Sequence, residues 1–260
     1  MKDHDLQIRK DKATLAADIV DALVARIDEA LQQRGEAHVV LTGGSMGEAV
    51  MQAWSARPAD DADRSAVHLW WGDERWVPAG DAERNDQQAV DAGLKRLGIP
   101  DDNIHRMPAA GGSYGDDVER AAAAYASELA EFDEADTNGL EEDPAVPTFD
   151  VLMLGVGPDG HIASLFPQHK AQNCTTTTTV AVHDSPKPPP TRISLTYPAI
   201  ERAREIWFTV AGADKADAVE RALTTDDPWN TPASAVEGLR ATVWWLDTAA
   251  AAKVPSNDAS

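Results

Sequence analysis

The sequence predicts an α/β protein with a mainly parallel, Rossmann-like sheet and helices on both of its faces, in a three-layer sandwich. Short apolar runs alternate with amphipathic helical patterns along most of the chain. This alternation is typical of βαβ units, whose strands are parallel. The run "FDVLMLGVG" (149–157) is almost continuously apolar, as expected of a strand covered on both faces. The 260 residues suit one large domain or two small ones.

The first half of the chain begins with a predicted helix, because five apolar residues recur at four-residue spacing. They are Leu15, Ile19, Leu23, Ile27 and Leu31. A strand that ends in a glycine turn (38–44), a helix (47–56) and a second strand (67–75) follow. Helical patterns then cover about 82–97 and about 116–132.

The second half contains the strand at 149–157, two further strands at 205–212 and 241–247, and a helix at 215–223 between those two. Two segments are predicted to be irregular: an acidic, turn-rich loop (132–147) and a threonine- and proline-rich loop (168–190) with a short strand near 180–182. We expect a single α/β domain over 13–248, a flexible N-terminus over 1–12 and a disordered tail over 249–260.

Composition excludes several classes of protein. The net charge is −21, from 44 acidic and 23 basic residues, and such a surface repels the phosphates of nucleic acids and anionic lipids. No apolar run approaches the roughly 20 residues of a membrane span, and the charged N-terminus lacks the apolar core of a signal peptide. Cys174 is the only cysteine. We therefore expect a cytoplasmic protein that binds neither nucleic acid nor membrane.

Glycines and polar residues follow four of the predicted strands, in "TGGS" (42–45), "GDER" (72–75), "GPDGH" (157–161) and "AGADK" (211–215). Ligands of open parallel sheets bind outside the carboxyl ends of the strands. The four segments are therefore predicted to meet at one crevice. In so acidic a protein, an anion bound there needs a local group of arginines, lysines and backbone N–H groups.

The "TGGSMG" segment offers such groups. Gly43 and Gly44 let the backbone approach an anion, and the N–H groups of the following helix point at it. An ordinary strand-to-helix turn is the alternative. The segment also matches the G-x-S-x-G nucleophile elbow, which would make Ser45 a nucleophile. We discount that match because it follows the first strand of this pattern and no oxyanion segment of the His-Gly-Gly-Gly type accompanies it.

Three cationic side chains are candidates for anion binding. Arg75 follows a strand between tryptophans and could clamp a phosphate or an oxyanion; a surface salt bridge is the alternative. Lys215 starts a helix, where the dipole disfavours a cation unless an anion is present, although exposure to solvent is the commoner explanation of such a lysine. Arg192 follows a stiff proline run that would hold it in place, but its position alone does not indicate a function.

Asp159 and His161 stand two positions apart at the end of the clearest strand. Either they form a catalytic pair, or the segment is a plain turn in which Asp159 caps a helix. Metal binding is not expected, because the seven histidines show no H-E-x-x-H spacing and there is no pair of cysteines.

Together these segments resemble the 6-phosphogluconolactonases, within the larger group that includes glucosamine-6-phosphate deaminase. The matching pieces span about 38–236 and include "LTGGS", "WWGDERWVP", "FDVLMLGVGPDGHIASLFP", "DSPKPPPTRISLTYPAI" and "FTVAGADKADAV". The resemblance implies a sugar-phosphate isomerase/deaminase-like fold. It also implies an enzyme that hydrolyses 6-phospho-D-glucono-1,5-lactone in the oxidative pentose phosphate pathway, without metal or organic cofactor.

The resemblance also implies a role for each candidate. His161 would take a proton from the attacking water, Asp159 would orient the imidazole, and Arg75 would stabilise the oxyanion. Ser45, the Gly43–Gly44 backbone, Arg192 and Lys215 would hold the 6-phosphate. The partner is then a small sugar phosphate lactone. We expect a monomer, although the sequence does not fix the oligomeric state.

Two alternatives are kept. A deaminase or isomerase is disfavoured, because these relatives carry a glutamate where this chain has Phe166. A non-catalytic sugar-phosphate sensor normally comes with a basic DNA-binding segment, and this chain has none. One departure from the family pattern concerns the phosphate loop: Met46 and Gly47 replace the usual Thr-Pro after the serine.

Overall fold

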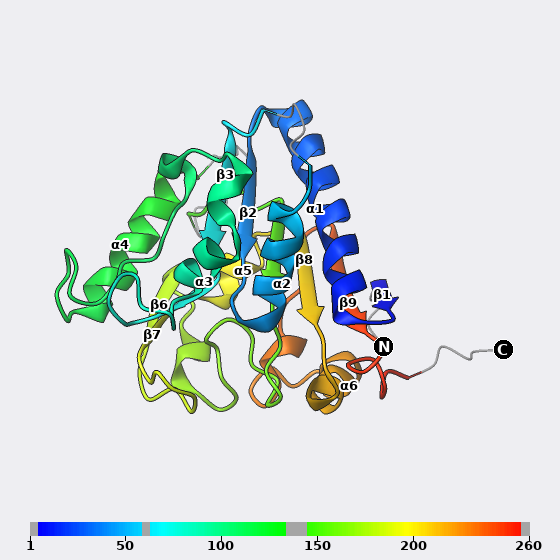
Figure 1. Cartoon of the computed structure of the whole chain (residues 1–260). Coiled ribbons are helices and arrows are strands. Elements are labelled where there is room, and N and C mark those ends of the chain that lie inside the picture. The colour runs from blue at the N-terminus through cyan, green and yellow to red at the C-terminus, as the bar shows by residue number, and fades with distance from the viewer. Residues whose placement is uncertain (1–4, 59–62, 134–144, 256–260) are drawn as a thin grey trace.

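A computed structural model describes residues 5–58, 63–133 and 145–255 of the chain. Its main sheet has six strands in the order β1-β9-β8-β5-β2-β3, and every neighbouring pair is parallel (Figure 1). The strands are β1 (Asp5–Arg9), β2 (Ala37–Leu41), β3 (Val67–Trp71), β5 (Val151–Leu154), β8 (Glu205–Val210) and β9 (Ala241–Asp247). Every residue of β2 and β5 is buried. Both faces of the sheet are therefore covered, and the predicted fold class is confirmed.

A second, antiparallel sheet lies beside the first (Figure 1). It consists of β4 (Asp73–Arg75), β7 (Arg192–Leu195) and β6 (Thr179–Val182). The chain passes from β3 into β4 through the single residue Gly72, so the end of a main-sheet strand leads directly into the second sheet. The short strand predicted near 180–182 is β6.

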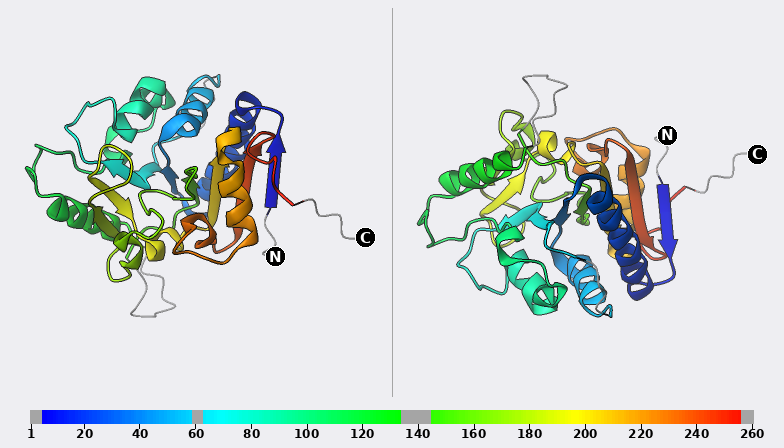
Figure 2. Two further views of the ribbon diagram at one scale, coloured as in Figure 1. Left: turned by 90° about the horizontal axis from the view of Figure 1, so that it is seen from below. Right: turned by 90° about the horizontal axis from the view of Figure 1, so that it is seen from above.

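The described residues form six α-helices, of which five fall close to the predicted positions and the short one at 197–200 was not predicted. They are α1 (Lys12–Arg34), α2 (Gly44–Ser55), α3 (Asn85–Ala92), α4 (Val118–Glu131), α5 (Tyr197–Ile200) and α6 (Ala216–Thr224). Short 3-10 helices are η1 (Leu94–Leu97), η2 (Asp101–Asn103), η3 (Lys170–Asn173), η4 (Ala213–Lys215) and η5 (Pro232–Ser234). In Figure 2, α1 and α2 lie side by side, and α4 lies beside the second sheet.

The first helix shows why its sequence folds as predicted. The side chain of Asp11 accepts a hydrogen bond from the backbone N–H of Thr14, which caps the N-terminus. Gly35 ends the helix at φ 86°, in the left-handed region that favours glycine. Four of the five predicted apolar positions are buried, and Leu31 is half-buried. The apolar face of α1 packs against β1, β2 and β9.

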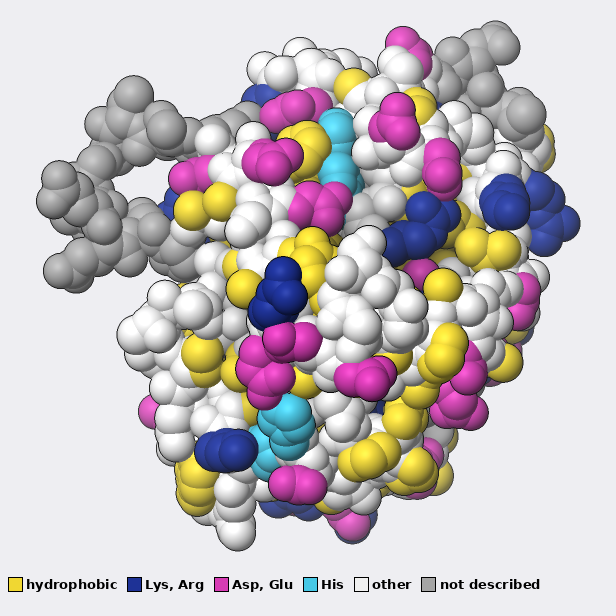
Figure 3. All heavy atoms as spheres, turned by 90° about the vertical axis from the view of Figure 1, so that its left-hand side faces the viewer, with side chains coloured by type: hydrophobic (Ala, Val, Ile, Leu, Met, Phe, Trp, Pro, Cys, Tyr) yellow, Lys and Arg dark blue, Asp and Glu magenta, His cyan; other side chains and the backbone are white. Residues whose placement is uncertain are grey.

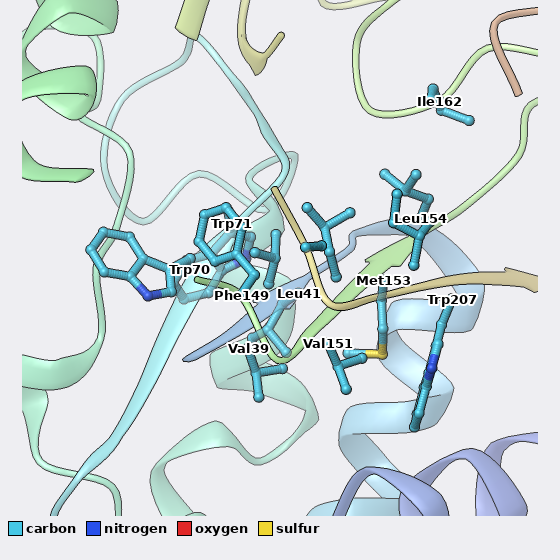
Figure 4. Close-up of a cluster of buried hydrophobic side chains, with 14 of the residues drawn as sticks. Val39, Leu41, Trp70, Trp71, Phe149, Val151, Met153, Leu154, Ile162 and Trp207 are labelled. Atoms are coloured by element: carbon cyan, nitrogen blue, oxygen red, sulfur yellow. The ribbon is translucent and has the colours of Figure 1, made fainter. Parts of the chain in front are cut away.

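The core is one continuous cluster of buried side chains. Figure 4 shows its centre, where side chains from neighbouring strands meet: Val39 and Leu41 of β2, Trp70 and Trp71 of β3, Val151 and Met153 of β5, and Trp207 of β8. All seven are at most 4% exposed. Dense packing beneath the strands gives a rigid base for the loops at their carboxyl ends.

The two ends of the chain differ from the expectation. The N-terminus was expected to be flexible over 1–12, but Asp5–Arg9 form β1, which pairs with β9 from Asp5↔Val243 to Arg9↔Asp247. Backbone groups of β9 that would otherwise form an open sheet edge are thereby paired. In the expected tail (249–260), Ala250 is fully buried, and its N–H donates to Asp247 Oδ1 at 2.7 Å. Residues 1–4 and 256–260 lie outside the described residues.

The acidic segment predicted as a loop (132–147) lies largely outside the described residues, which omit 134–144. On the face of the molecule that carries α4 and the second sheet, acidic side chains are scattered among basic and apolar ones (Figure 3). None of the helices in the described ranges is both long and apolar enough to cross a membrane.

Candidate active site

A cavity of about 290 Å³ lies outside the carboxyl ends of β2, β5 and β8 and reaches β4 and β7, at the lower end of the sheet in Figure 1. Seven of the eight predicted site residues line it: Gly43, Gly44, Ser45, Arg75, His161, Arg192 and Lys215. The eighth, Asp159, is hydrogen-bonded to His161. The four loops that were predicted to meet therefore do meet at one cavity.

Asp159 and His161 form a hydrogen-bonded pair, with 2.6 Å between Asp159 Oδ1 and His161 Nδ1. The carboxylate fixes Nδ1 as the protonated nitrogen, so the lone pair of the ring lies on Nε2. Nε2 has no hydrogen-bond partner within the described ranges. The side chain of His161 is 16% exposed, so a small molecule can reach it. The segment is thus more than a turn.

Electrostatics adapt this pair to proton transfer. Burial lowers the pKa of His161, whereas the hydrogen bond to Asp159 raises it, and the net shift is downward. The imidazole is therefore neutral near pH 7 and able to accept a proton. For Asp159, burial raises the pKa, but the hydrogen bond and charge of His161 and the charge of Lys187 outweigh it. Asp159 is an anion and can stabilise an imidazolium.

Gly157 allows the pair to fold back on the strand end. A Cβ atom at this position would lie 2.0 Å from His161 Nδ1 and 2.4 Å from Asp159 Oδ1. Any side chain at 157 would therefore displace the pair. The other face of the imidazole packs against the fully buried ring of Phe166, with 4.5 Å between ring centroids.

The "TGGS" segment forms the N-terminus of α2. Gly43 is the N-cap residue and the helix begins at Gly44, whose φ of 71° lies in the left-handed region. The first N–H groups of a helix lack intrahelical partners and attract anions. Ser45 is exposed within this turn. The departure at Gly47 is matched to the local geometry, because a Cβ there would lie 2.0 Å from the backbone oxygen of Thr42.

Arg75 and Arg192 are direct cross-strand neighbours in β4 and β7. Arg75 donates from Nη1 to the carbonyl of Glu83, and its buried Nε has no hydrogen-bond partner in the part of the chain that the structure describes. The guanidinium of Arg192 is held by the carbonyls of Pro188 and Pro189 at 3.0 and 3.1 Å. The proline run thus positions Arg192, as predicted. Two adjacent guanidinium groups at one cavity favour an anionic ligand.

Lys215 lines the cavity and follows β8 in the chain. It ends η4 and directly precedes α6. Its Nζ lies 3.5 Å from Asp214 Oδ2, and the side chain is 23% exposed. The cavity is therefore lined by the cationic side chains of Arg75, Arg192 and Lys215 as well as by the imidazole of His161.

Two functional side chains were missed by the sequence reasoning. The carboxylate of Asp73 lines the cavity and is buried, and it accepts a hydrogen bond of 2.5 Å from Ser164 Oγ. Lys187 approaches both members of the catalytic pair at 3.3 Å. Asp73 stands in the quoted "GDER", and Lys187 in the quoted "DSPKPPP". Their places within segments that match the family were the only available signal.

No group of three or more His, Cys, Asp or Glu side chains within the described ranges is arranged to hold a metal ion. The cavity offers hydrogen-bond donors, the carboxylate of Asp73 and the imidazole of His161, which is bound from behind by Asp159. Such a set suits acid–base chemistry on a polar anion.

Comparison with known proteins agrees with this chemistry. The family model described as glucosamine-6-phosphate isomerases/6-phosphogluconolactonase matches residues 10–245. A 6-phosphogluconolactonase of Streptomyces coelicolor is 49% identical, over 96% of this chain and 94% of the relative. A 6-phosphogluconolactonase of Mycobacterium tuberculosis is 47% identical, over 96% of this chain and 98% of the relative.

Solved structures give the same picture. The 6-phosphogluconolactonase of Trypanosoma brucei matches with a TM-score of 0.80 and 27% identity, covering 97% of this chain and 99% of that one. A monomeric glucosamine-6-phosphate deaminase matches with a TM-score of 0.75, covering 96% of this chain and 99% of that one, but at 17% identity. The second likeness bears on the fold alone.

Proposed function

The chain belongs to the glucosamine-6-phosphate isomerase/6-phosphogluconolactonase family, and from this premise we propose that it hydrolyses 6-phospho-D-glucono-1,5-lactone to 6-phosphogluconate. It is an enzyme, a hydrolase of a sugar phosphate lactone in the oxidative pentose phosphate pathway. The observation that carries the proposal is the neutral His161, bound to Asp159 at 2.6 Å and facing a cavity with cationic sides.

In the proposed mechanism, Nε2 of His161 accepts a proton from a water molecule as that water attacks the lactone carbonyl carbon. The carbonyl becomes a tetrahedral oxyanion, and the imidazolium is stabilised by Asp159. When the ring C–O bond breaks, the imidazolium returns its proton to the leaving ring oxygen. No covalent enzyme intermediate is needed. General-base catalysis of this kind contributes about 10²–10⁴-fold in rate.

The cationic groups of the cavity have two tasks in this proposal. Arg75 stabilises the oxyanion, because its guanidinium lines the cavity and its Nε has no hydrogen-bond partner within the described residues, so it can donate charge-assisted hydrogen bonds. Ser45, the Gly43–Gly44 backbone, Lys215 and Arg192 bind the 6-phosphate, which carries roughly −1.5 to −2 charges. Arg192 also touches the oxyanion side, because it is the cross-strand neighbour of Arg75.

Phe166 separates this reaction from that of the deaminases. Its fully buried ring packs on His161 and has no group that could exchange a proton with an amine or an opened sugar. We therefore expect activity with freshly generated 6-phosphogluconolactone in an assay coupled to oxidation of the product. Glucosamine 6-phosphate, assayed in parallel, should give no product. Turnover of glucosamine 6-phosphate without lactone hydrolysis would overturn the proposal.

The role of Ser45 is tested separately. Ser45→Ala should raise KM and leave kcat nearly unchanged, because a phosphate contact is lost but no nucleophile. A covalent adduct on Ser45, detected by mass spectrometry of quenched reactions, would instead support the nucleophile-elbow alternative.

The cellular location and the oligomeric state of the enzyme are also part of the proposal. We propose that the enzyme works in the cytoplasm and acts as a monomer. The face of the molecule that carries α4 and the second sheet is mixed in charge, as expected of a face in contact with solvent (Figure 3). Light scattering coupled to size-exclusion chromatography should give about the mass of one 27.9 kDa chain, and twice that mass would exclude a monomer.

A further inference from the structure

We propose that Lys187 is a positioning residue of the catalytic pair: its ammonium group binds the Asp159 carboxylate beside His161 and disfavours a second positive charge on the imidazole. The proposal rests on the proposed function, in which His161 must be neutral before it accepts a proton. Lys187 would thereby extend the range of pH over which the enzyme is active toward the acidic side.

The contact geometry carries the proposal. Lys187 Nζ lies 3.3 Å from Asp159 Oδ1 and 3.3 Å from His161 Nδ1. The same carboxylate oxygen accepts the N–H of the imidazole at 2.6 Å. One oxygen of Asp159 is therefore shared by two cationic or potentially cationic donors. The ammonium of Lys187 partly neutralises the charge of the Asp159 carboxylate, which therefore stabilises an imidazolium at His161 less strongly.

The backbone of Lys187 is held in place by neighbours in its own segment. Ser185 Oγ donates to the carbonyl of Lys187 at 2.9 Å and accepts from its N–H at 3.2 Å. Arg192 Nη2 donates to the same carbonyl at 3.2 Å. The lysine is thus anchored at its base, although its side chain is 39% exposed. A lysine anchored in this way differs from one that samples the solvent freely.

Charges face His161 from several elements. Asp159 of its own loop and Asp73 of β4 favour the imidazolium, and Lys187, from the segment before β7, opposes it. The remaining charged side chains that line the cavity are Arg75, Arg192 and Lys215. Burial is the largest cause that lowers the pKa of His161, and Lys187 adds to it. Without the ammonium, two carboxylates would act on the imidazole with less opposition.

The test is the pH profile of kcat/KM for Lys187→Met and Lys187→Arg, corrected for spontaneous hydrolysis of the lactone. In Lys187→Met, kcat/KM should begin to fall at a pH about one unit higher than in the wild type. This is the size expected for the loss of one charge at this distance in a partly solvated site. The plateau at higher pH should be retained within a few-fold. Lys187→Arg keeps the charge, so its limb should stay near that of the wild type.

A matched control is Lys170→Met, which removes an exposed lysine outside the cavity and should not move the limb. If the apparent pKa of the acidic limb in Lys187→Met stays within about 0.2 pH units of the wild-type value, the proposal is overturned. So would a large loss of the plateau without a shift, since the ammonium would then act on the substrate.

The titration of His161 can also be followed by NMR of its ring, with the signal assigned from its loss in His161→Asn. This readout does not depend on turnover. If the protein shows no lactonase activity, the proposed function fails, but the ring of His161 should still titrate at higher pH in Lys187→Met. An unchanged ring titration would reject the role of Lys187 on its own.

Discussion

At the scale of single residues, the reactivity of His161 depends on three neighbours that fix its ring. Asp159 holds Nδ1 at 2.6 Å, Phe166 supports one face of the ring, and Gly157 leaves room behind the pair. Each neighbour comes from the same segment of the chain. The spacing in "GPDGHIASLF" therefore encodes the orientation of the base locally.

Gly157→Ala should lower kcat/KM by about 10-fold or more, because its Cβ would lie 2.0 Å from His161 Nδ1 and the pair must move. The free energy of unfolding should change little, by about 1 kcal/mol. Kinetics with the lactone, together with urea unfolding, measure both quantities.

Gly72→Ala is the matched control, because a Cβ at Gly72 would have its nearest neighbour at 3.7 Å and the residue does not have a positive φ. If Gly157→Ala and Gly72→Ala lose the same amount of activity, the effect of Gly157→Ala does not come from a clash with the Asp159–His161 pair.

Seven of the eight predicted site residues stand in motifs that follow strands, and such motifs converge wherever the sheet is parallel. The eighth, Arg192, was indicated only by the family resemblance. The sequence did not predict Lys187. The lysine stands 26 residues from His161, and its approach depends on how the proline segment is held by Ser185 and Arg192. Contacts between separate loops leave no periodic pattern in the sequence.

At the scale of elements, the start of α2 shows how one departure from the family pattern is accommodated. Gly47 lies where a Cβ would come within 2.0 Å of the carbonyl of Thr42. The first turn of α2 thus lies against the end of β2 more closely than a residue with a Cβ would allow. The N–H groups of this turn are part of the proposed phosphate site.

Gly47→Ala should therefore raise KM several-fold, because the first turn of α2 must shift away from Thr42, whereas kcat should fall less. Glu48→Ala, an exposed change one residue further along the helix, is the control and should leave both constants close to those of the wild type. A lower or unchanged KM in Gly47→Ala would show that the phosphate does not depend on this turn.

Elements with a strong apolar period were predicted well. The four predicted positions of α1 that are buried and the continuous apolar run of β5 are examples. β1 was missed because only its pairing with β9 defines it: its residues "DLQIR" are exposed or half-buried and charged at both ends. An edge strand with so little burial has almost no signal of its own in the sequence.

At the scale of the whole molecule, a cluster of histidines lies at the end of the sheet opposite the cavity. The rings of His38 and His68 stack at 4.7 Å, and His68 Nδ1 lies 3.0 Å from His105 Nε2. Trp70 Nε1 donates to His38 Nδ1 at 3.1 Å. Burial, together with the neighbouring histidines, lowers the pKa of His38 to about 3. The mechanism does not use this cluster.

His38 makes the fold sensitive to acid. In the folded protein it stays neutral down to about pH 3, whereas in the unfolded chain it binds a proton below about pH 6.5. The contribution of neutral His38 to the free energy of unfolding is therefore complete above pH 6.5 and is lost progressively as the pH falls below 6.5. The slope expected from this one group is about 1.4 kcal/mol per pH unit.

Urea unfolding between pH 7.5 and 5 measures this slope. His38→Gln should reduce this slope by the amount that corresponds to about one proton bound on unfolding, whatever the effect of the substitution on stability at pH 7.5. If His38→Gln keeps the full slope, other groups cause the loss of stability in acid.

The central claim is that His161 activates water in a cavity formed by loops of separate strands. The most direct test is kcat/KM of His161→Ala with 6-phosphogluconolactone near neutral pH, after subtraction of spontaneous hydrolysis and with unfolding in urea as a check on the fold. We predict a loss of about 10²–10⁴-fold with the free energy of unfolding nearly unchanged. A folded His161→Ala variant that keeps kcat/KM within about threefold of the wild type would contradict the account.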